Sequence, residues 1–158
     1  MGTTFQIEKQ TEPNWCWAAV SVSVGRYFFP QSTSTQCKVA ATVLSETSCC
    51  ATPDACNKPQ RLEPALNAVN TPPNIVTRAL TFDEIRKQID ASRPVCVRIA
   101  WNGGPRGHFV VISGYQLLRS GAQQVNVADP FYADSTVDYN DFVASYQGSG
   151  QWTATFLV

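Results

Sequence analysis

The chain has 158 residues, of which 44% are hydrophobic and 15% are charged, and its 12 basic and 12 acidic residues leave a formal net charge of zero. This length suits a single domain over residues 1–158 that buries its own core. The balanced charge, without a stripe of lysine and arginine, argues against a nucleic-acid-binding surface, and the apolar runs are too short to cross a bilayer.

The first half of the chain predicts helices, after a short strand over residues 5–8. A Pro-Asn turn precedes the first helix, which we expect to begin at Cys16 with Asn14 as its cap and to end near residue 29, before Pro30. Its apolar side chains recur at helical spacing. Three further helices are expected over residues 36–44, 60–69 and 82–91, the last with Thr81 or Asp83 as its cap.

The second half is rich in β-branched residues and predicts strands. Four strands are expected there, over residues 95–101, 108–117, 123–128 and 152–158. A glycine-rich connection spans residues 102–107, a hairpin turn spans 118–122, and a short helix is expected over 138–146. Helices followed by strands predict an α+β domain, with a helical half over about residues 1–92 and a β half over about 93–158.

Four of the six cysteines lie in a polar stretch over residues 45–58 or just before it: Cys37, Cys49, Cys50 and Cys56. Zinc sites usually show paired Cys-x2-Cys spacings, which this stretch lacks, so we favour disulfides over a metal site. A bridge between adjacent Cys49 and Cys50 would strain the backbone, so Cys37 pairs with one of them and Cys56 with the other. We favour Cys37–Cys50 and Cys49–Cys56, which imply an oxidising compartment. Cys96, in a predicted buried strand, is expected to be a core residue.

Cys16 and the only histidine, His108, remain as candidates for covalent chemistry. A cysteine attacks a carbonyl as the thiolate, which a helix N-terminus or a nearby imidazolium favours. Cys16 is expected at such an N-terminus, and His108 begins a strand after the glycine-rich connection. The structural alternatives are a buried core cysteine and an ordinary surface or core histidine.

Together these segments resemble the papain-like cysteine proteases, most closely the compact bacterial ones: the AvrRpt2-like effectors and relatives of the bacteriocin-processing peptidases. Gln10 and Cys16 have the Gln-x5-Cys spacing of those families, and Trp17 and two alanines follow the cysteine. Residues 107–115 are similar to the segment that carries the family histidine. Asp129, before Pro130 at the end of a predicted strand, is similar to the family aspartate. The resemblance covers about residues 10–141, and the Cys-Cys and Cys-Asn pairs at 49–50 and 56–57 also resemble bacterial members.

The resemblance implies a papain-like fold, in which the nucleophile helix packs on an antiparallel sheet, and a catalytic triad. Cys16 would attack the scissile carbonyl, His108 would carry the proton from the thiol to the leaving amine, and Asp129 would orient the imidazole. The side-chain amide of Gln10 and the backbone N–H of Cys16 would bind the oxyanion. Four residues nearby are rivals for the role of Asp129: Asn126, Asp134, Asp138 and Asp141.

Aromatic and glycine residues flank these positions. Trp15, Trp17 and Trp101 are expected either to wall a substrate cleft or to pack in the core. Gly103 and Gly104 either pair with an extended substrate backbone or belong to a flexible loop.

The expected function is a cysteine endopeptidase that is secreted or delivered into a target cell as a bacterial effector or toxin, although no signal peptide is visible near Met1. We expect a monomer that uses no cofactor or metal and contacts neither nucleic acid nor membrane. Its partners would be a protein or peptide substrate and a cognate inhibitor or immunity protein. Two alternatives stand: a glutamine deamidase or transglutaminase on the same triad, and a non-catalytic, disulfide-stapled binding module.

Overall fold

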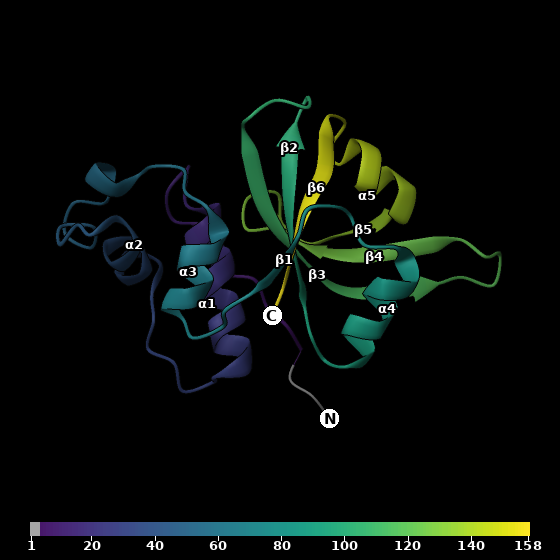
Figure 1. Ribbon diagram of the computed structural model, residues 1–158, viewed down its shortest axis with the longest axis horizontal. Coiled ribbons are helices and arrows are strands. Elements are labelled where there is room, and N and C mark those ends of the chain that lie inside the picture. Colours follow the sequence, from purple (N-terminus) through teal and green to yellow (C-terminus); the bar gives the residue numbers. More distant parts are fainter. Residues whose placement is uncertain (1–3) are drawn as a thin grey trace.

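The computed structural model describes residues 4–158, which form an α+β fold with the helices first and the sheet after them. Helices α1 (Cys16–Phe28), α2 (Gln36–Leu44) and α3 (Leu62–Ala68) gather on one side of the molecule with the short 3-10 helix η1 (Pro53–Cys56), as Figure 1 shows. The strands, α4 (Phe82–Asp90) and α5 (Tyr139–Ser145) form the other side. The predicted fold class is confirmed.

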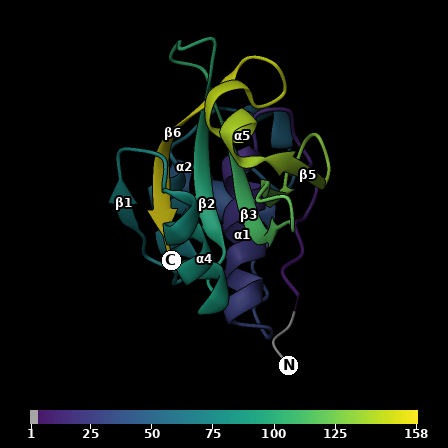
Figure 2. The same cartoon turned by 90° about the vertical axis from the view of Figure 1, so that its right-hand side faces the viewer.

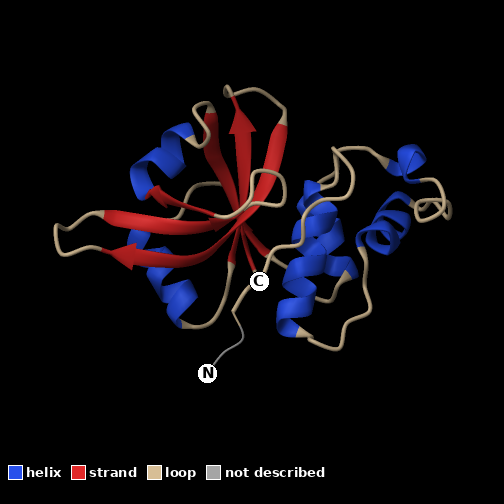
Figure 3. Ribbon diagram, turned by 180° about the vertical axis from the view of Figure 1, so that it is seen from behind, coloured by secondary structure: helices blue, strands red, loops and turns tan. Residues whose placement is uncertain are grey.

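The sheet has six antiparallel strands in the order β1-β6-β2-β3-β4-β5 (Figure 3). Their bounds are β1 (Asn74–Val76), β2 (Val95–Trp101), β3 (Gly107–Leu117), β4 (Gln123–Ala128), β5 (Ser135–Asp138) and β6 (Gly150–Leu157). The central strands β2, β3, β4 and β6 are those that the sequence predicts.

Helices cover both faces of this sheet (Figure 2). Cys96 and Val111 belong to the core cluster that α1, α2 and α3 complete. Their strand neighbours Val97 and Val110 point to the opposite face and pack in a second cluster with residues of α4 and α5. Burial on both faces explains why β2 reads as an almost continuous apolar run rather than as an alternating pattern.

Several elements of the first half differ from the sequence prediction. Residues 5–8 form no strand, because side chains of α1 hold this segment: Glu8 N–H donates to Ser23 Oγ at 2.8 Å and the Glu8 carboxylate pairs with Arg26 at 2.8 Å. The prediction of Asn14 as the cap of α1 is wrong, because Trp15 occupies the N-cap position and no side chain caps the helix.

Two edge strands, β1 and β5, were not expected. Each has only three or four residues and lies at an edge of the sheet, so neither carries a long β-branched run in the sequence. The predicted cap of α4 is confirmed as Thr81, whose side chain and that of Glu84 form a reciprocal capping box.

The cysteines pair as favoured, in the disulfides Cys37–Cys50 and Cys49–Cys56. Both bridges lie in and beside the long loop between α2 and α3, and Cys49 and Cys56 are fully buried. Cys96 is a free, fully buried thiol on β2. Burial raises the pKa of Cys96 to about 12, so this thiol remains neutral and serves as a small core residue.

Candidate active site

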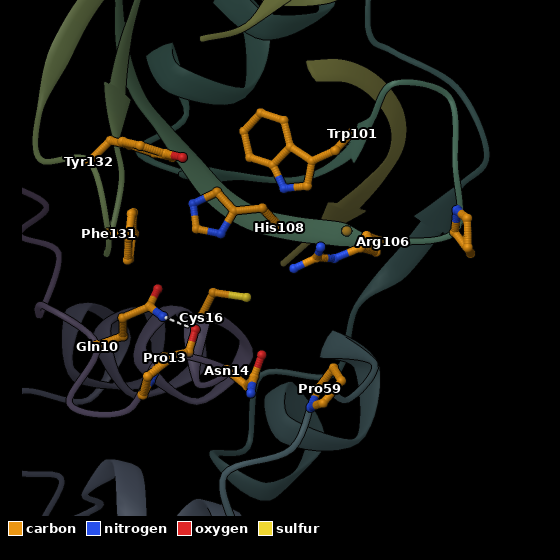
Figure 4. A pocket seen from close by; sticks show the side chains of 12 residues that line it. Gln10, Pro13, Asn14, Cys16, Pro59, Trp101, Arg106, His108, Phe131 and Tyr132 are labelled. Atoms are coloured by element: carbon orange, nitrogen blue, oxygen red, sulfur yellow. Dashed lines mark hydrogen bonds between the residues drawn. The ribbon is translucent and has the colours of Figure 1, made fainter. Parts of the chain in front are cut away.

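A pocket of about 400 Å³ opens between the start of α1 and the β2–β3 end of the sheet. Cys16 and His108 both line it, one from each side, and Figure 4 shows the imidazole ring beside the Cys16 side chain. The other lining residues come from the loop before α1, from the end of β2 and the β2–β3 connection, and from the segment after β4, with Pro59 from the loop before α3. The fold therefore brings together two residues that are 92 positions apart in the chain, since 108 minus 16 is 92.

Cys16 is the first residue of α1. It lines the pocket and is only 8% exposed. As the first helical residue it has a backbone N–H without an intrahelical partner. The positive end of the helix dipole lies at this position, and it stabilises negative charge on a nearby sulfur or oxygen. The predicted placement of Cys16 at a helix N-terminus is confirmed.

The disulfide-stapled loop holds the residues on either side of Cys16. Asn57 Oδ1 accepts a hydrogen bond from the Asn14 N–H at 3.0 Å. The indole N–H of Trp15 donates to the Cys56 carbonyl at 2.7 Å, and the indole N–H of Trp17 donates to the Lys58 carbonyl at 3.0 Å. Three consecutive loop residues thus anchor the nucleophile segment. Trp15 and Trp17 are buried in the core and do not line the pocket.

His108 is the second residue of β3 and is almost fully buried. Its Nε2 lies 2.9 Å from Asp129 Oδ1, so Nδ1 is the nitrogen left to exchange a proton with Cys16. Trp101 stacks on the ring at a centroid distance of 6.0 Å and an interplanar angle of 21°. Tyr132 meets it edge-on at 6.0 Å. These aromatic side chains keep water away from the His108–Asp129 hydrogen bond.

The Asp129 side chain has no solvent exposure, and four donors surround its carboxylate. Oδ1 accepts hydrogen bonds from His108 and from the backbone N–H groups of Phe131, at 2.8 Å, and Tyr132, at 2.9 Å. Oδ2 accepts a 2.5 Å bond from the Tyr146 hydroxyl. Tyr146 carries no motif in the sequence, and the sequence analysis missed it.

The four rivals of Asp129 either form hydrogen bonds to other residues or are exposed to solvent. Asp138 caps α5 by accepting from the backbone N–H groups of Asn140 and Asp141, and Asn126 Oδ1 accepts from Thr136 Oγ1. Asp134 and Asp141 are exposed at the surface. Among residues 4–158, Asp129 is the carboxylate that is hydrogen-bonded to His108.

The site shifts the pKa values of three buried groups, His108, Asp129 and Tyr146. Burial alone would lower the pKa of His108, but the hydrogen bond to Asp129, followed by the adjacent Cys16 side chain, outweighs burial and raises it to about 9. Burial would raise the pKa of Asp129, yet the hydrogen bonds from His108 and Tyr146 hold it below its ordinary value. Burial and then the bond to Asp129 raise the pKa of the Tyr146 hydroxyl, which therefore remains a donor. The arrangement favours an imidazolium beside an aspartate anion.

Gln10 lines the pocket, but its side-chain amide is already engaged. Nε2 donates to the carbonyls of Glu12, at 3.0 Å, and Pro13, at 2.8 Å, while Oε1 is buried without a partner. The Gln10 backbone N–H donates to the Pro130 carbonyl at 3.0 Å, which ties this loop to the Asp129 side of the cleft. The oxyanion role of Gln10 stays a prediction, and it requires one amide N–H to turn away from its carbonyl.

Trp101 lines this pocket and a second one of about 420 Å³ beside it, which Gly104 also lines. Gly103 lines neither, and it adopts a φ of 67° where the β2–β3 connection turns. Three further residues that line the first pocket were not predicted from the sequence: Arg106, Phe131 and Tyr132. The one signal that the sequence offers for Phe131 and Tyr132 is that they are adjacent aromatics directly after Asp129-Pro130, and both are exposed in the structure.

Within residues 4–158, no group of three or more histidine, cysteine, aspartate or glutamate side chains is placed to hold a metal ion. In the same part of the chain, no helix is long and apolar enough to cross a membrane. A protein-family model described as papain-like cysteine protease AvrRpt2 matches residues 2–147, and no curated protein gives a significant match.

Proposed function

The chain belongs to the papain-like cysteine protease family of AvrRpt2, and we propose that it is an endopeptidase that cleaves peptide bonds through a thioester on Cys16. The observation that supports this most is the buried 2.9 Å hydrogen bond between His108 Nε2 and Asp129 Oδ1, in a pocket where the Cys16 side chain lies beside the same imidazole ring. A nucleophile, a base and a group that orients the base are the three parts that acyl transfer requires.

Acylation begins with the proton of the Cys16 thiol already held on His108 Nδ1, and the thiolate sulfur adds to the scissile carbonyl carbon. The negative charge moves to the carbonyl oxygen, where the Cys16 N–H and an amide N–H of Gln10 donate to it. Each donor of this kind contributes about 2.7–4 kcal/mol to the transition state. When the carbon–nitrogen bond breaks, the imidazolium returns its proton to the leaving amine.

Deacylation repeats these steps with water. Neutral His108 takes a proton from a water molecule, whose oxygen adds to the thioester carbon, and the sulfur then leaves as the thiolate beside protonated His108. Throughout both stages the Asp129 carboxylate holds the ring by Nε2 and stabilises its cationic form. Tyr146 and two backbone N–H groups hold the carboxylate in turn.

We also propose that the enzyme works outside the cell that makes it, as a secreted protein or as an effector or toxin delivered into a target cell. Two disulfides in the Cys37–Cys56 region support passage through an oxidising compartment. Its partners would be a protein substrate and a cognate inhibitor or immunity protein. The protein would act as a monomer without a cofactor.

A glutamine deamidase or transglutaminase is the second candidate, because it forms the same thioester from a side-chain amide. The same cysteine, histidine and aspartate serve either reaction, so the chemistry of the site supports both. The non-catalytic binding module is less well supported, because binding alone does not require a buried aspartate–histidine pair beside a cysteine, and burying such groups is costly.

The test is to expose a proteome to the protein and to sequence the new N-termini, with Cys16→Ala as the control. A peptidase produces N-termini that are absent from the control. A deamidase instead produces deamidated glutamine residues without new N-termini, and a binding module produces neither.

A further inference from the structure

Arg106 lies in the connection between β2 and β3, two residues before His108, and lines both pockets of the cleft. Figure 4 shows its side chain extending into the opening on the side of His108 and Cys16. The two pockets share Trp101, Pro105 and Tyr132 as well, so they form one groove that passes over this arginine. A chain bound along the groove would therefore contact Arg106 close to the reacting carbonyl.

The guanidinium of Arg106 forms no ion pair with any residue in the described range 4–158. Neither Arg106 nor Arg98 takes part in the salt bridges formed within residues 4–158. Among the described residues, no aspartate or glutamate lines either pocket. A guanidinium is a cation with five N–H donors and no acceptor, so the groove carries a positive charge near Cys16.

A second arginine fixes the position of this loop. Arg98 donates through Nη2 to the Pro105 carbonyl at 3.0 Å and through Nη1 to Thr153 Oγ1 at 3.0 Å. Its guanidinium fills the space beside Gly107, where an added Cβ would lie 3.0 Å from it. The Arg106 carbonyl accepts from the Trp101 N–H at 3.0 Å. Arg98 thus adds a second unpaired cation behind the loop and limits the movement of the backbone that carries Arg106.

We propose that Arg106 selects substrates with a carboxylate, the side chain of an aspartate or glutamate, a few residues from the scissile bond. This inference rests on the proposed peptidase function and adds the substrate class to it. Guanidinium and carboxylate form two parallel hydrogen bonds, which fix the direction of the bound chain as well as its charge. Trp101 and Tyr132, whose rings meet edge-on at a centroid distance of 6.2 Å, line both pockets together with Arg106 and would flank the bound carboxylate.

The test is a peptide library with randomised positions on both sides of the cleavage site, made with free and with amidated C-termini. Wild type is expected to prefer aspartate or glutamate at one position by about tenfold or more in kcat/KM, in amidated as in free peptides. Arg106→Gln should lose this preference, Arg106→Lys should retain part of it, and Arg106→Glu should replace it with a preference for lysine or arginine. Added salt should weaken the preference of wild type.

Arg119, exposed in the β3–β4 hairpin turn and absent from the walls of both pockets, provides the matched control. Arg119→Gln should retain the acidic preference, and thermal unfolding checks that each variant is folded. Three results overturn the inference: cleavage by wild type without an acidic preference, a preference that survives in Arg106→Gln, and a preference confined to free C-termini. If wild type cleaves no peptide that Cys16→Ala leaves intact, the proposed function itself fails and the inference falls with it.

Discussion

The hydroxyl of Tyr146 donates a 2.5 Å hydrogen bond to Asp129 Oδ2, while His108 is bonded to Oδ1 of the same carboxylate. Tyr146 follows the end of α5, and its ring packs among the residues between α5 and the sheet. A core side chain thus contacts the Asp129 carboxylate at the oxygen that His108 does not use. The orientation of His108 therefore depends on Tyr146 as well as on Asp129.

Replacing Tyr146 by phenylalanine should remove the hydrogen bond to Asp129 while the aromatic ring still fills its place in the core. The free energy of unfolding should fall by about 1.5–3 kcal/mol, the range for a hydrogen bond to a charged group. Loss of the donor leaves Asp129 more basic, so the pKa of His108 should rise and the alkaline limb of the kcat/KM profile should move to higher pH. Tyr139→Phe is the control, because the Tyr139 hydroxyl donates to the Leu80 carbonyl, away from the site. A Tyr146→Phe profile identical to that of Tyr139→Phe would contradict this role.

Replacing Asp129 by asparagine should move the alkaline limb of the kcat/KM profile to lower pH, opposite to the effect of Tyr146→Phe. The folded pKa of His108, about 9, lies above the ordinary value of 6.5, so wild type keeps its imidazolium up to pH values near 9 and loses it above them. Asparagine removes the anion that raises this pKa, and the alkaline limb should therefore move to lower pH. The rate should fall on the order of a hundredfold. Measurement of kcat/KM from acid to alkaline pH checks both effects, and an unmoved limb would show that Asp129 does not set the protonation of His108.

The raised pKa of His108 also makes the stability of the fold depend on pH. An unfolded histidine titrates near 6.5. The extra stability of protonated His108 is therefore complete below that pH and disappears as the pH rises through about 9. Denaturant unfolding between pH 6 and 10 should show this loss in wild type and not in His108→Gln. A wild type whose dependence on pH matches that of the variant would contradict the assignment.

Replacing Asn57 by alanine should loosen the segment that carries Cys16. The variant loses the acceptor of the Asn14 N–H, a hydrogen bond that contributes about 1 kcal/mol, so alkylation of Cys16 should slow by roughly fivefold. Asn67→Ala, at an exposed position of α3, is the matched control. Equal alkylation rates in the two variants would show that the stapled loop does not position the nucleophile.

The two disulfides should affect stability and activity differently. In the chain-entropy model, the Cys37–Cys50 bridge, with a sequence separation of 13, contributes about 3 kcal/mol, and the Cys49–Cys56 bridge, with a separation of 7, about 2.5 kcal/mol. Cys56 also supplies the carbonyl that holds Trp15, so the paired serine variant of Cys49 and Cys56 should lose more activity at similar stability. Thermal unfolding and kcat/KM of the two paired variants check this, and the reverse order of activity would contradict it.

The sequence predicts the parts of this fold whose signal is local. Helix α2 begins and ends as expected because Thr35 caps it and its apolar spacing is regular. The four central strands are long and β-branched, whereas β1 and β5 depend on a neighbouring strand for their existence. Asn14 fails as a cap because its side chain donates to the Asn57 carbonyl, a tertiary contact 43 residues away in the chain.

The candidate site also contains residues that the sequence predicts and residues that it does not. Asp129 was favoured from the expected pairing of two strands, and the register agrees with that reasoning: Val111 of β3 pairs with Ala128 of β4, which places His108 and Asp129 at the same end. Tyr146 and Arg106 could not be predicted, because neither lies in a motif and each acquires its place only when distant segments pack together. The burial of Trp15 and Trp17 likewise follows from their bonds to the stapled loop.

The central claim is that His108 activates Cys16 as a nucleophile, and the rate at which iodoacetamide alkylates Cys16 tests it most directly. Mass mapping of the native protein at neutral pH compares Cys16 with Cys96, the other free cysteine among residues 4–158. We predict that Cys16 reacts much faster than Cys96 and that His108→Gln removes most of this advantage in a folded protein. A Cys16 that reacts as slowly as Cys96, or equally fast without the imidazole, would contradict the account.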